Sequence, residues 1–188
     1  ATAALGLGVV LGGEAELLLF SFGKNLDFVL RVDTLGRLFA LVVDVVWVLS
    51  GFYAFEYMKH EQEEKRFFGF YVMVFGILHG LVFSGGMVTY YLFYELMTLL
   101  SVPMVVHERT PQAVAAGVKY LIYSIFGAMM GLLGIFFFQH YLGSVTFTPG
   151  GLASAAAAPQ MGLLVITFVV ILGFGTKAQH RAKADCGQ

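Results

Sequence analysis

The chain has 188 residues, of which 59% are hydrophobic and only 12% charged, and its mean hydropathy is +0.81. Because an ordinary soluble domain is about 25% charged, this chain cannot cover a globule with polar surface, and we expect lipid to be its solvent. A net charge of −1 excludes a basic nucleic-acid surface, and the single cysteine, Cys186, excludes a disulfide framework or a multi-cysteine metal site built from this chain alone.

In chain order, apolar runs alternate with polar breaks. Residues 1–12 are apolar and glycine-rich but lack a preceding basic segment, which favours the stub of a helix, to about Phe20, over a signal peptide. The polar connection "SFGKNLDFVLRVD" follows and leads into five longer apolar runs. These runs cover residues 35–58, 67–84, 87–106, 113–142 and 161–177. The breaks between them are "KHEQEEKR", the pair Gly85-Gly86, "HERTPQ" and a Gly/Ala/Ser-rich loop over residues 143–160.

The length of the runs predicts helices that cross a membrane. A bilayer core of about 30 Å needs about 20 helical residues, and every run but the marginal 161–177 reaches or approaches that length. The runs are continuous rather than alternating, which disfavours barrel strands, and helices satisfy their own backbone in lipid. We therefore expect an all-α, polytopic transmembrane helical bundle of about five spanning helices plus the N-terminal stub. It forms one domain, residues 1–178, followed by a polar tail, residues 179–188.

The distribution of Lys and Arg predicts the orientation of this bundle. If the helices alternate in direction, residues 21–37, Gly85-Gly86 and 143–160 share one side, which carries three basic residues. The other side holds residues 59–66, 107–112 and the C-terminal tail, which carry six. Since cytoplasmic loops are enriched in Lys and Arg, we expect residues 59–66 and the C-terminus to be cytoplasmic. The expected location is the inner (plasma) membrane of a bacterium or archaeon.

Glu95 is the most informative ionisable residue in the apolar runs. It is the ninth of twenty residues in its run, so its carboxylate cannot reach either end. A charge at the bilayer centre costs at least about 2.5–3.5 kcal/mol, and helical spacing places the hydroxyls of Tyr91, Thr98 and Ser101 on or near its face. The pattern favours a titratable carboxylate on a proton or cation path. The alternative is a structural hydrogen bond between helices.

Four other ionisable residues lie in or at the ends of the runs. By depth alone, Lys119 and Lys177 are as consistent with side chains that extend to the membrane surface as with function. His79 is compatible with a packed, neutral imidazole. Asp44 is compatible with a basic partner in another chain or with a wet cavity. His79 and Asp44 are the secondary candidates.

No recognisable catalytic motif is present, so the chain alone predicts no catalytic site, no cofactor and no metal. Haem ligation by His79 and His140 is a weaker idea, since their helices need not place the two rings together.

The ordered combination of motifs resembles the antiporter-like subunits of respiratory complex I, membrane-bound hydrogenases and Mrp-type Na⁺/H⁺ antiporters. "LRVDTLGRLFALVVDVVWVLSGFYAFEYM" is similar to the opening of such subunits, and "RFFGFYVMVFGILHGLVFSGGMVTYYLFYELMTLLSVPMVVHE" to the next two helices. "AAGVKYLIYSIFGAMMGLLGI" resembles the helix after that, and "LGFGTKA" the family's lysine-bearing helix. The resemblance covers residues 30–178.

The resemblance implies roles for three residues. The family's glutamate maps onto Glu95 and its later-helix lysine onto Lys177, and in the family this charge pair modulates a proton half-channel. Lys119 matches a lysine of the subunits whose helix reads K-x-x-x-Y-S. After "GTKA" the family continues with a Phe-Pro-Leu-His-like stretch, where this chain has "QHRAKADCGQ". We therefore expect a truncated, split or frameshifted subunit, or a fragment that another chain completes.

These observations predict part of a proton- or Na⁺-translocating membrane subunit of a larger respiratory or antiporter complex. Its partners would be the bilayer, H⁺ or Na⁺ and other membrane subunits, without nucleic acid. Whether the parent complex is an oxidoreductase of the NADH dehydrogenase or hydrogenase type stays open. The alternative is a structural or assembly scaffold without its own ion path, in which the charges are dry and fully paired. A redox enzyme would instead need histidines paired across helices.

Overall fold

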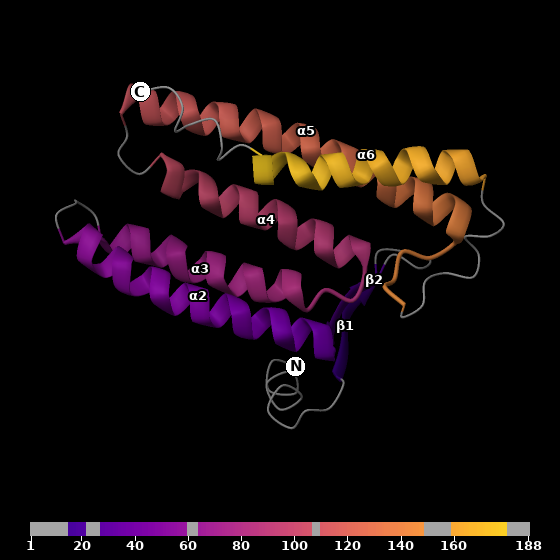
Figure 1. The fold of residues 1–188 in the computed structure, drawn as a ribbon, viewed down its shortest axis with the longest axis horizontal. Helices are drawn as coiled ribbons and strands as arrows, with labels where there is room; N and C mark the ends of the chain where they lie inside the picture. Colours follow the sequence, from indigo (N-terminus) through magenta and orange to yellow (C-terminus); the bar gives the residue numbers. More distant parts are fainter. Residues whose placement is uncertain (1–14, 22–26, 60–63, 107–109, 149–158, 180–188) are drawn as a thin grey trace.

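The computed structural model describes residues 15–21, 27–59, 64–106, 110–148 and 159–179. In this part of the chain a two-stranded hairpin precedes five helices, which run alongside one another (Figure 1). The elements are β1 (Ala15–Ser21), β2 (Asp27–Val32), α2 (Thr34–Met58), α3 (Glu64–Val82), α4 (Met87–Val105), α5 (Pro111–Leu142) and α6 (Gln160–Gln179).

The helix boundaries follow local capping chemistry. The Asp33 carboxylate caps α2 by accepting from the Gly36 amide at 2.6 Å. The Thr110 hydroxyl caps α5 by accepting from the Ala113 amide at 3.1 Å, and Pro111 occupies the first turn, where its missing N–H is not needed. The same helix ends at Gly143, whose φ of 70° is a left-handed conformation that favours glycine.

The structure confirms the predicted fold class. Helices α2, α3, α4 and α5 are each long and apolar enough to cross a membrane, and α6 has a shorter apolar portion, Gln160–Gly175. Large apolar side chains cover the outside of the bundle; Phe52 and Tyr53 on α2, for example, are 71% and 73% exposed. Such a surface is expected for helices in lipid or against other membrane subunits. The chain is therefore an integral membrane protein.

The N-terminal segment differs from the prediction. The stub was expected to be helical, but residues 15–21 form strand β1, which pairs antiparallel with β2. Residues 1–14 lie outside the described part. The helical interpretation rested on apolar composition, which does not separate a short helix from a strand. Strand β2 lies within the segment that was expected to be a polar connection, and its Phe28, Val29 and Val32 side chains are buried.

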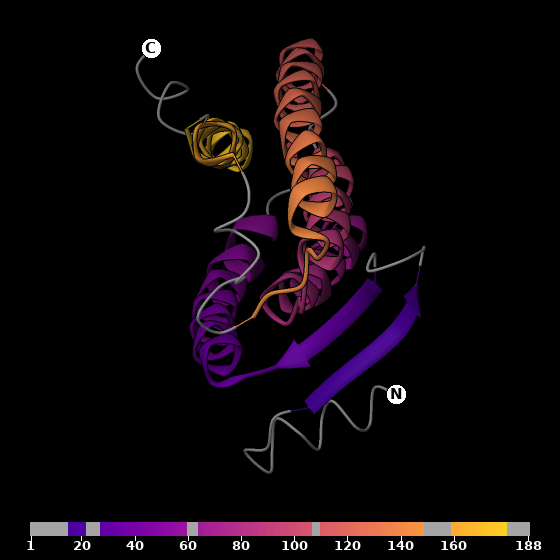
Figure 2. The same cartoon turned by 90° about the vertical axis from the view of Figure 1, so that its right-hand side faces the viewer.

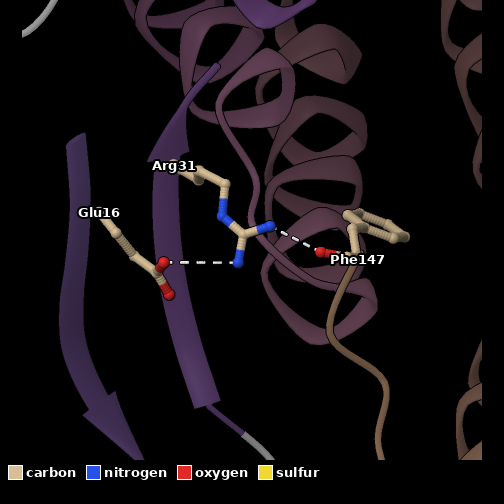
Figure 3. Close-up of polar contacts among 3 residues, drawn as sticks. All are labelled: Glu16, Arg31 and Phe147. Atoms are coloured by element: carbon tan, nitrogen blue, oxygen red, sulfur yellow. Dashed lines mark hydrogen bonds and ion pairs between the residues drawn. The ribbon is translucent and has the colours of Figure 1, made fainter. Parts of the chain in front are cut away.

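The hairpin packs against the end of the bundle where α3 joins α4 (Figures 1 and 2). The Gly85 amide donates to the Val29 carbonyl at 2.8 Å, and the Met87 amide donates to the Val145 carbonyl at 2.8 Å. Figure 3 shows the Arg31 guanidinium between two acceptors, the Phe147 carbonyl at 2.6 Å and the Glu16 carboxylate at 3.4 Å. The hairpin, the α3–α4 turn and residues 145–147 therefore lie together, and we call this the hairpin end.

Glycines allow α5 and α6 to approach closely. A Cβ atom on Gly173 of α6 would lie 2.8 Å from the carbonyl oxygen of Gly127 on α5, and one on Gly131 would lie 3.0 Å from the Phe174 ring. Gly134 is tighter still, since its Cβ would overlap a methyl group of Val170. The spacing of Gly127 and Gly131 predicts such an approach from sequence alone.

Candidate functional site

Glu95 lies near the middle of α4, with apolar residues on either side along the helix. Its side chain is partly buried, and its Oε1 atom exposes less than 1 Å². A carboxylate at this position is held within the protein rather than at a membrane surface.

Hydroxyl groups continue from Glu95 towards α5. Thr98, one turn further along α4, is 2% exposed, and its hydroxyl donates to the Tyr94 carbonyl at 3.2 Å. The Ser101 hydroxyl lies 2.8 Å from that of Tyr120 on α5. Of the hydroxyls predicted to lie near Glu95, that of Ser101 therefore joins α4 to α5. On α5, Ser124 is also buried, one turn after Tyr120.

A second contact joins α4 to α6. The Tyr94 hydroxyl donates to the Gly173 carbonyl at 3.5 Å, and the Phe174 ring packs edge-on against Tyr94 with centroids 4.9 Å apart. Because α4 and α6 both run away from the hairpin end (Figure 1), residues further along each helix stay level with one another. Lys177 follows Gly173 by one turn, so its backbone lies near the level of Thr98.

Lys119 lies elsewhere. It is in the third turn of α5, next to Tyr120, and its side chain is exposed. Tyr120 rather than Lys119 contacts α4, because consecutive helical residues point about 100° apart. The structure therefore places the backbone of Lys177 one helical turn beyond the contact of α6 with α4, and it places the Lys119 side chain on the outside of α5.

Asp44 and His79, considered separately in the sequence, meet across α2 and α3. Asp44 Oδ1 lies 3.1 Å from His79 Nε2, and their side chains are 53% and 25% exposed. The other ring nitrogen of His79, Nδ1, lies 3.0 Å from the Phe75 carbonyl oxygen. The partner of Asp44 is thus within this chain, whereas the sequence pointed to another chain or a wet cavity.

The two histidines in the described part of the chain, His79 and His140, each have other ring neighbours. The His79 ring contacts Asp44 and Phe75, while His140, near the end of α5, packs edge-on against Tyr141 with ring centroids 4.8 Å apart. Within the part of the chain that the structure describes, no three His, Cys, Asp or Glu residues gather as a metal site would require.

The fold and these polar groups define a class: a helical membrane protein with a partly buried carboxylate midway along one of its helices. Comparison with known families gives a specific assignment. Residues 84–181 match the family "NADH:quinone oxidoreductase/Mrp antiporter, TM", and residues 19–68 match "NADH-Ubiquinone oxidoreductase (complex I), chain 5 N-terminus". The chain belongs to this antiporter-like family.

Curated relatives include components of Na⁺/H⁺ antiporters. The chain is 21% identical over 168 residues to a Na⁺/H⁺ antiporter subunit from Alkalihalophilus pseudofirmus, an alignment that covers 89% of this chain and 34% of that protein. It is 32% identical over 115 residues to Na⁺/H⁺ antiporter subunit A1 of Staphylococcus aureus, which covers 61% of this chain and 14% of that protein. The chain therefore spans about a third or less of the length of these relatives.

Proposed function

We propose that this chain is part of a membrane subunit that translocates protons or Na⁺, with Glu95 as the titrating carboxylate and Lys177 as its modulating cation. The observation that carries the proposal is the burial of Glu95 Oε1 in the middle of α4, beside the contacts of α4 with α5 and α6. Membership of the antiporter-like family supports it, since the relatives are antiporter subunits.

The proposed mechanism is electrostatic. An ammonium group close to Glu95 favours the ionised carboxylate, and withdrawal of that group lets the apolar surroundings favour proton uptake. Lys177 suits this role because α6 carries it one turn beyond the Gly173 contact with Tyr94. Hydroxyls at Thr98, Ser101 and Tyr120 would relay the proton towards α5. Lys119, exposed on that helix, would act further along the path or against a neighbouring subunit.

Other membrane subunits are the proposed partners. The bundle exposes large apolar side chains on α2, and the relatives are named as subunits of antiporters. The remainder of an antiporter-like subunit, or a separate chain, would complete the half-channel. The driving force would be an ion gradient or a redox partner elsewhere in the assembly.

Replacing Lys177 tests the proposed cation. We expect Lys177→Met in the intact parent assembly to reduce ion uptake into vesicles strongly, because Glu95 then loses the group that controls its charge. Lys177→Arg should retain part of the activity, since it keeps a cation at the same position. Lys59→Met is the control: Lys59 is the C-cap residue that follows α2, and it pairs with Glu56 at the surface. Normal uptake by Lys177→Met at normal protein levels would refute the role of Lys177.

Labelling from each side tests the proposed orientation. We propose that residues 59–66 and the C-terminus face the cytoplasm of a bacterial or archaeal cell, and that the hairpin end faces outward. Single cysteines placed at Glu56 and at Phe147, in a background without Cys186, should react with a membrane-impermeant thiol reagent from opposite sides. In intact cells the reagent should label only position 147. Labelling of position 56 alone would reverse the orientation.

A further inference from the structure

Hydrogen-bond chemistry assigns the protons of the Asp44–His79 contact. His79 Nδ1 lies 3.0 Å from the Phe75 carbonyl oxygen, which only accepts hydrogen bonds, so Nδ1 carries a proton. His79 Nε2 lies 3.1 Å from Asp44 Oδ1. An ionised carboxylate also only accepts, so this second contact is a hydrogen bond only if another proton lies on Nε2 or on the carboxyl group.

We propose that Asp44 and His79 form a proton-binding site, which holds one exchangeable proton between Asp44 Oδ1 and His79 Nε2. Binding adds a proton from water to the Nε2 lone pair and forms an N–H bond, so the net charge of the two residues rises from −1 to zero. The imidazolium–carboxylate form and the neutral imidazole–carboxylic acid form contain the same protons. This site is separate from Glu95 and does not depend on the proposed function.

Aromatic side chains surround the His79 ring. The Phe75 and Phe83 rings have centroids 4.4 Å and 6.2 Å from that of His79. Trp47, nearly one turn after Asp44, stacks against Phe75 with centroids 5.6 Å apart. A pair that satisfies its own hydrogen bonds is compatible with such aromatic neighbours.

Other ionisable groups on the neighbouring elements are directed elsewhere. On α4, the residue that packs against α3 beside His79 is Phe93, whose ring lies where a Cβ on Gly80 would be. Glu95 is two residues further and about 200° around the same helix. From β2, Arg31 turns to Phe147 and Glu16.

Two other polar groups lie further from the Asp44–His79 contact, one on α2 and one on α3. The Arg37 guanidinium, two turns before Asp44, hydrogen-bonds the Asp33 carbonyl at 3.3 Å. The Tyr71 hydroxyl, two turns before His79, donates to the Trp47 carbonyl at 2.7 Å. Both groups are engaged with backbone, so Asp44 and His79 are each other's ionisable partners.

The depth of the pair gives it access to one side of the membrane. Gly36 of α2 packs against the end of α3, since its Cβ would lie 3.3 Å from the Val82 carbonyl oxygen. Asp44 is eight residues from Gly36, and His79 is three from Val82, which correspond to about 12 Å and about 5 Å along the two helices. Because helical side chains lean towards their own N-termini, the two groups meet between these depths. The hairpin end is therefore the nearer end of the two helices for exchange of this proton with water.

Counting the protons on His79 and Asp44 tests the proposal. The full chain, with ¹⁵N-labelled histidine and ¹³C-labelled aspartate, is placed in lipid vesicles at about pH 8, where an unperturbed histidine is neutral. Solid-state NMR should find two protons shared by Nδ1, Nε2 and the Asp44 carboxyl group, with the His79 signals identified by their loss in His79→Asn. A neutral ring with an ionised Asp44 in the wild-type chain would overturn the proposal without any variant.

A matched pair of variants separates this site from general effects on the helix. Asp44→Asn keeps the shape and removes the acid, so His79 should lose its second proton while Nδ1 stays protonated against Phe75. Glu56→Gln changes another acid on α2, which pairs with Lys59 at 2.6 Å, and should leave the His79 signals unchanged. An unaltered His79 signal in Asp44→Asn would also refute the site.

Discussion

Glu95→Gln is expected to abolish ion translocation by the intact parent assembly, or reduce it at least about tenfold, while the subunit still folds and assembles. Glutamine keeps the shape of the side chain and most of its hydrogen bonding but cannot gain or lose a proton. The burial of Oε1 makes this difference matter, because a charge that appears and disappears in an apolar medium changes the local electrostatic energy greatly. The measurement is proton or Na⁺ uptake into vesicles that contain the assembly.

The same substitution distinguishes transport from a scaffold role. If Glu95 is only a buried structural acid, glutamine should be neutral or stabilising, because the cost of burying a charge disappears. Glu56→Gln removes an exposed acid from α2 and serves as the control. Wild-type uptake by Glu95→Gln at normal protein levels would therefore remove the transport role and support the scaffold.

Combining Glu95→Gln with Lys177→Met tests whether the two residues act together. Residues in one electrostatic unit have non-additive effects, so the double variant should transport little worse than either single variant. Fully additive losses would show that Lys177 acts independently of Glu95, even if each residue is needed. This outcome would leave Glu95 as the titrating group and require another cation near it.

The transmembrane helices could be predicted from sequence because lipid imposes a simple rule of length and apolarity. The run predicted at residues 35–58 becomes α2 at Thr34–Met58, and the run at 113–142 becomes α5 at Pro111–Leu142. The hairpin could not be predicted so directly, because its strands are stabilised by distant segments. Val29, for example, donates its amide to the hydroxyl of Thr89, 60 residues away, at 2.8 Å. No local pattern contains that contact.

The candidate sites were predictable to different extents for a similar reason. Glu95 stands out because a carboxylate in an apolar run is costly wherever the helix lies. The contact of Asp44 with His79 depends on the register of α2 against α3, which packing at Gly51 and Trp47 sets and composition does not reveal. Tyr94 and Tyr120 were missed as interhelical contacts; their only signal was a hydroxyl at helical spacing in otherwise apolar runs.

The second large effect is expected at Gly134, where α5 meets α6. A methyl group added there would overlap Val170 Cγ2, and valine is a stiff, β-branched side chain that cannot move aside cheaply. Gly134→Ala should therefore push α6 away from α5 and destabilise the bundle by about 1–3 kcal/mol, the usual range for overpacking. Gly134→Leu should be worse.

A glycine in open space provides the control for this effect. Nothing lies within 4 Å of a Cβ placed on Gly76 of α3. Gly76→Ala should be neutral or stabilising by up to about 1 kcal/mol, because alanine is the better helix former. Thermal unfolding in detergent compares the two variants, and equal stability of Gly134→Ala and Gly76→Ala would contradict the close packing of α5 against α6. Because α6 carries Lys177, Gly134→Ala should also lower ion uptake in the parent assembly, even though it alters no ionisable group.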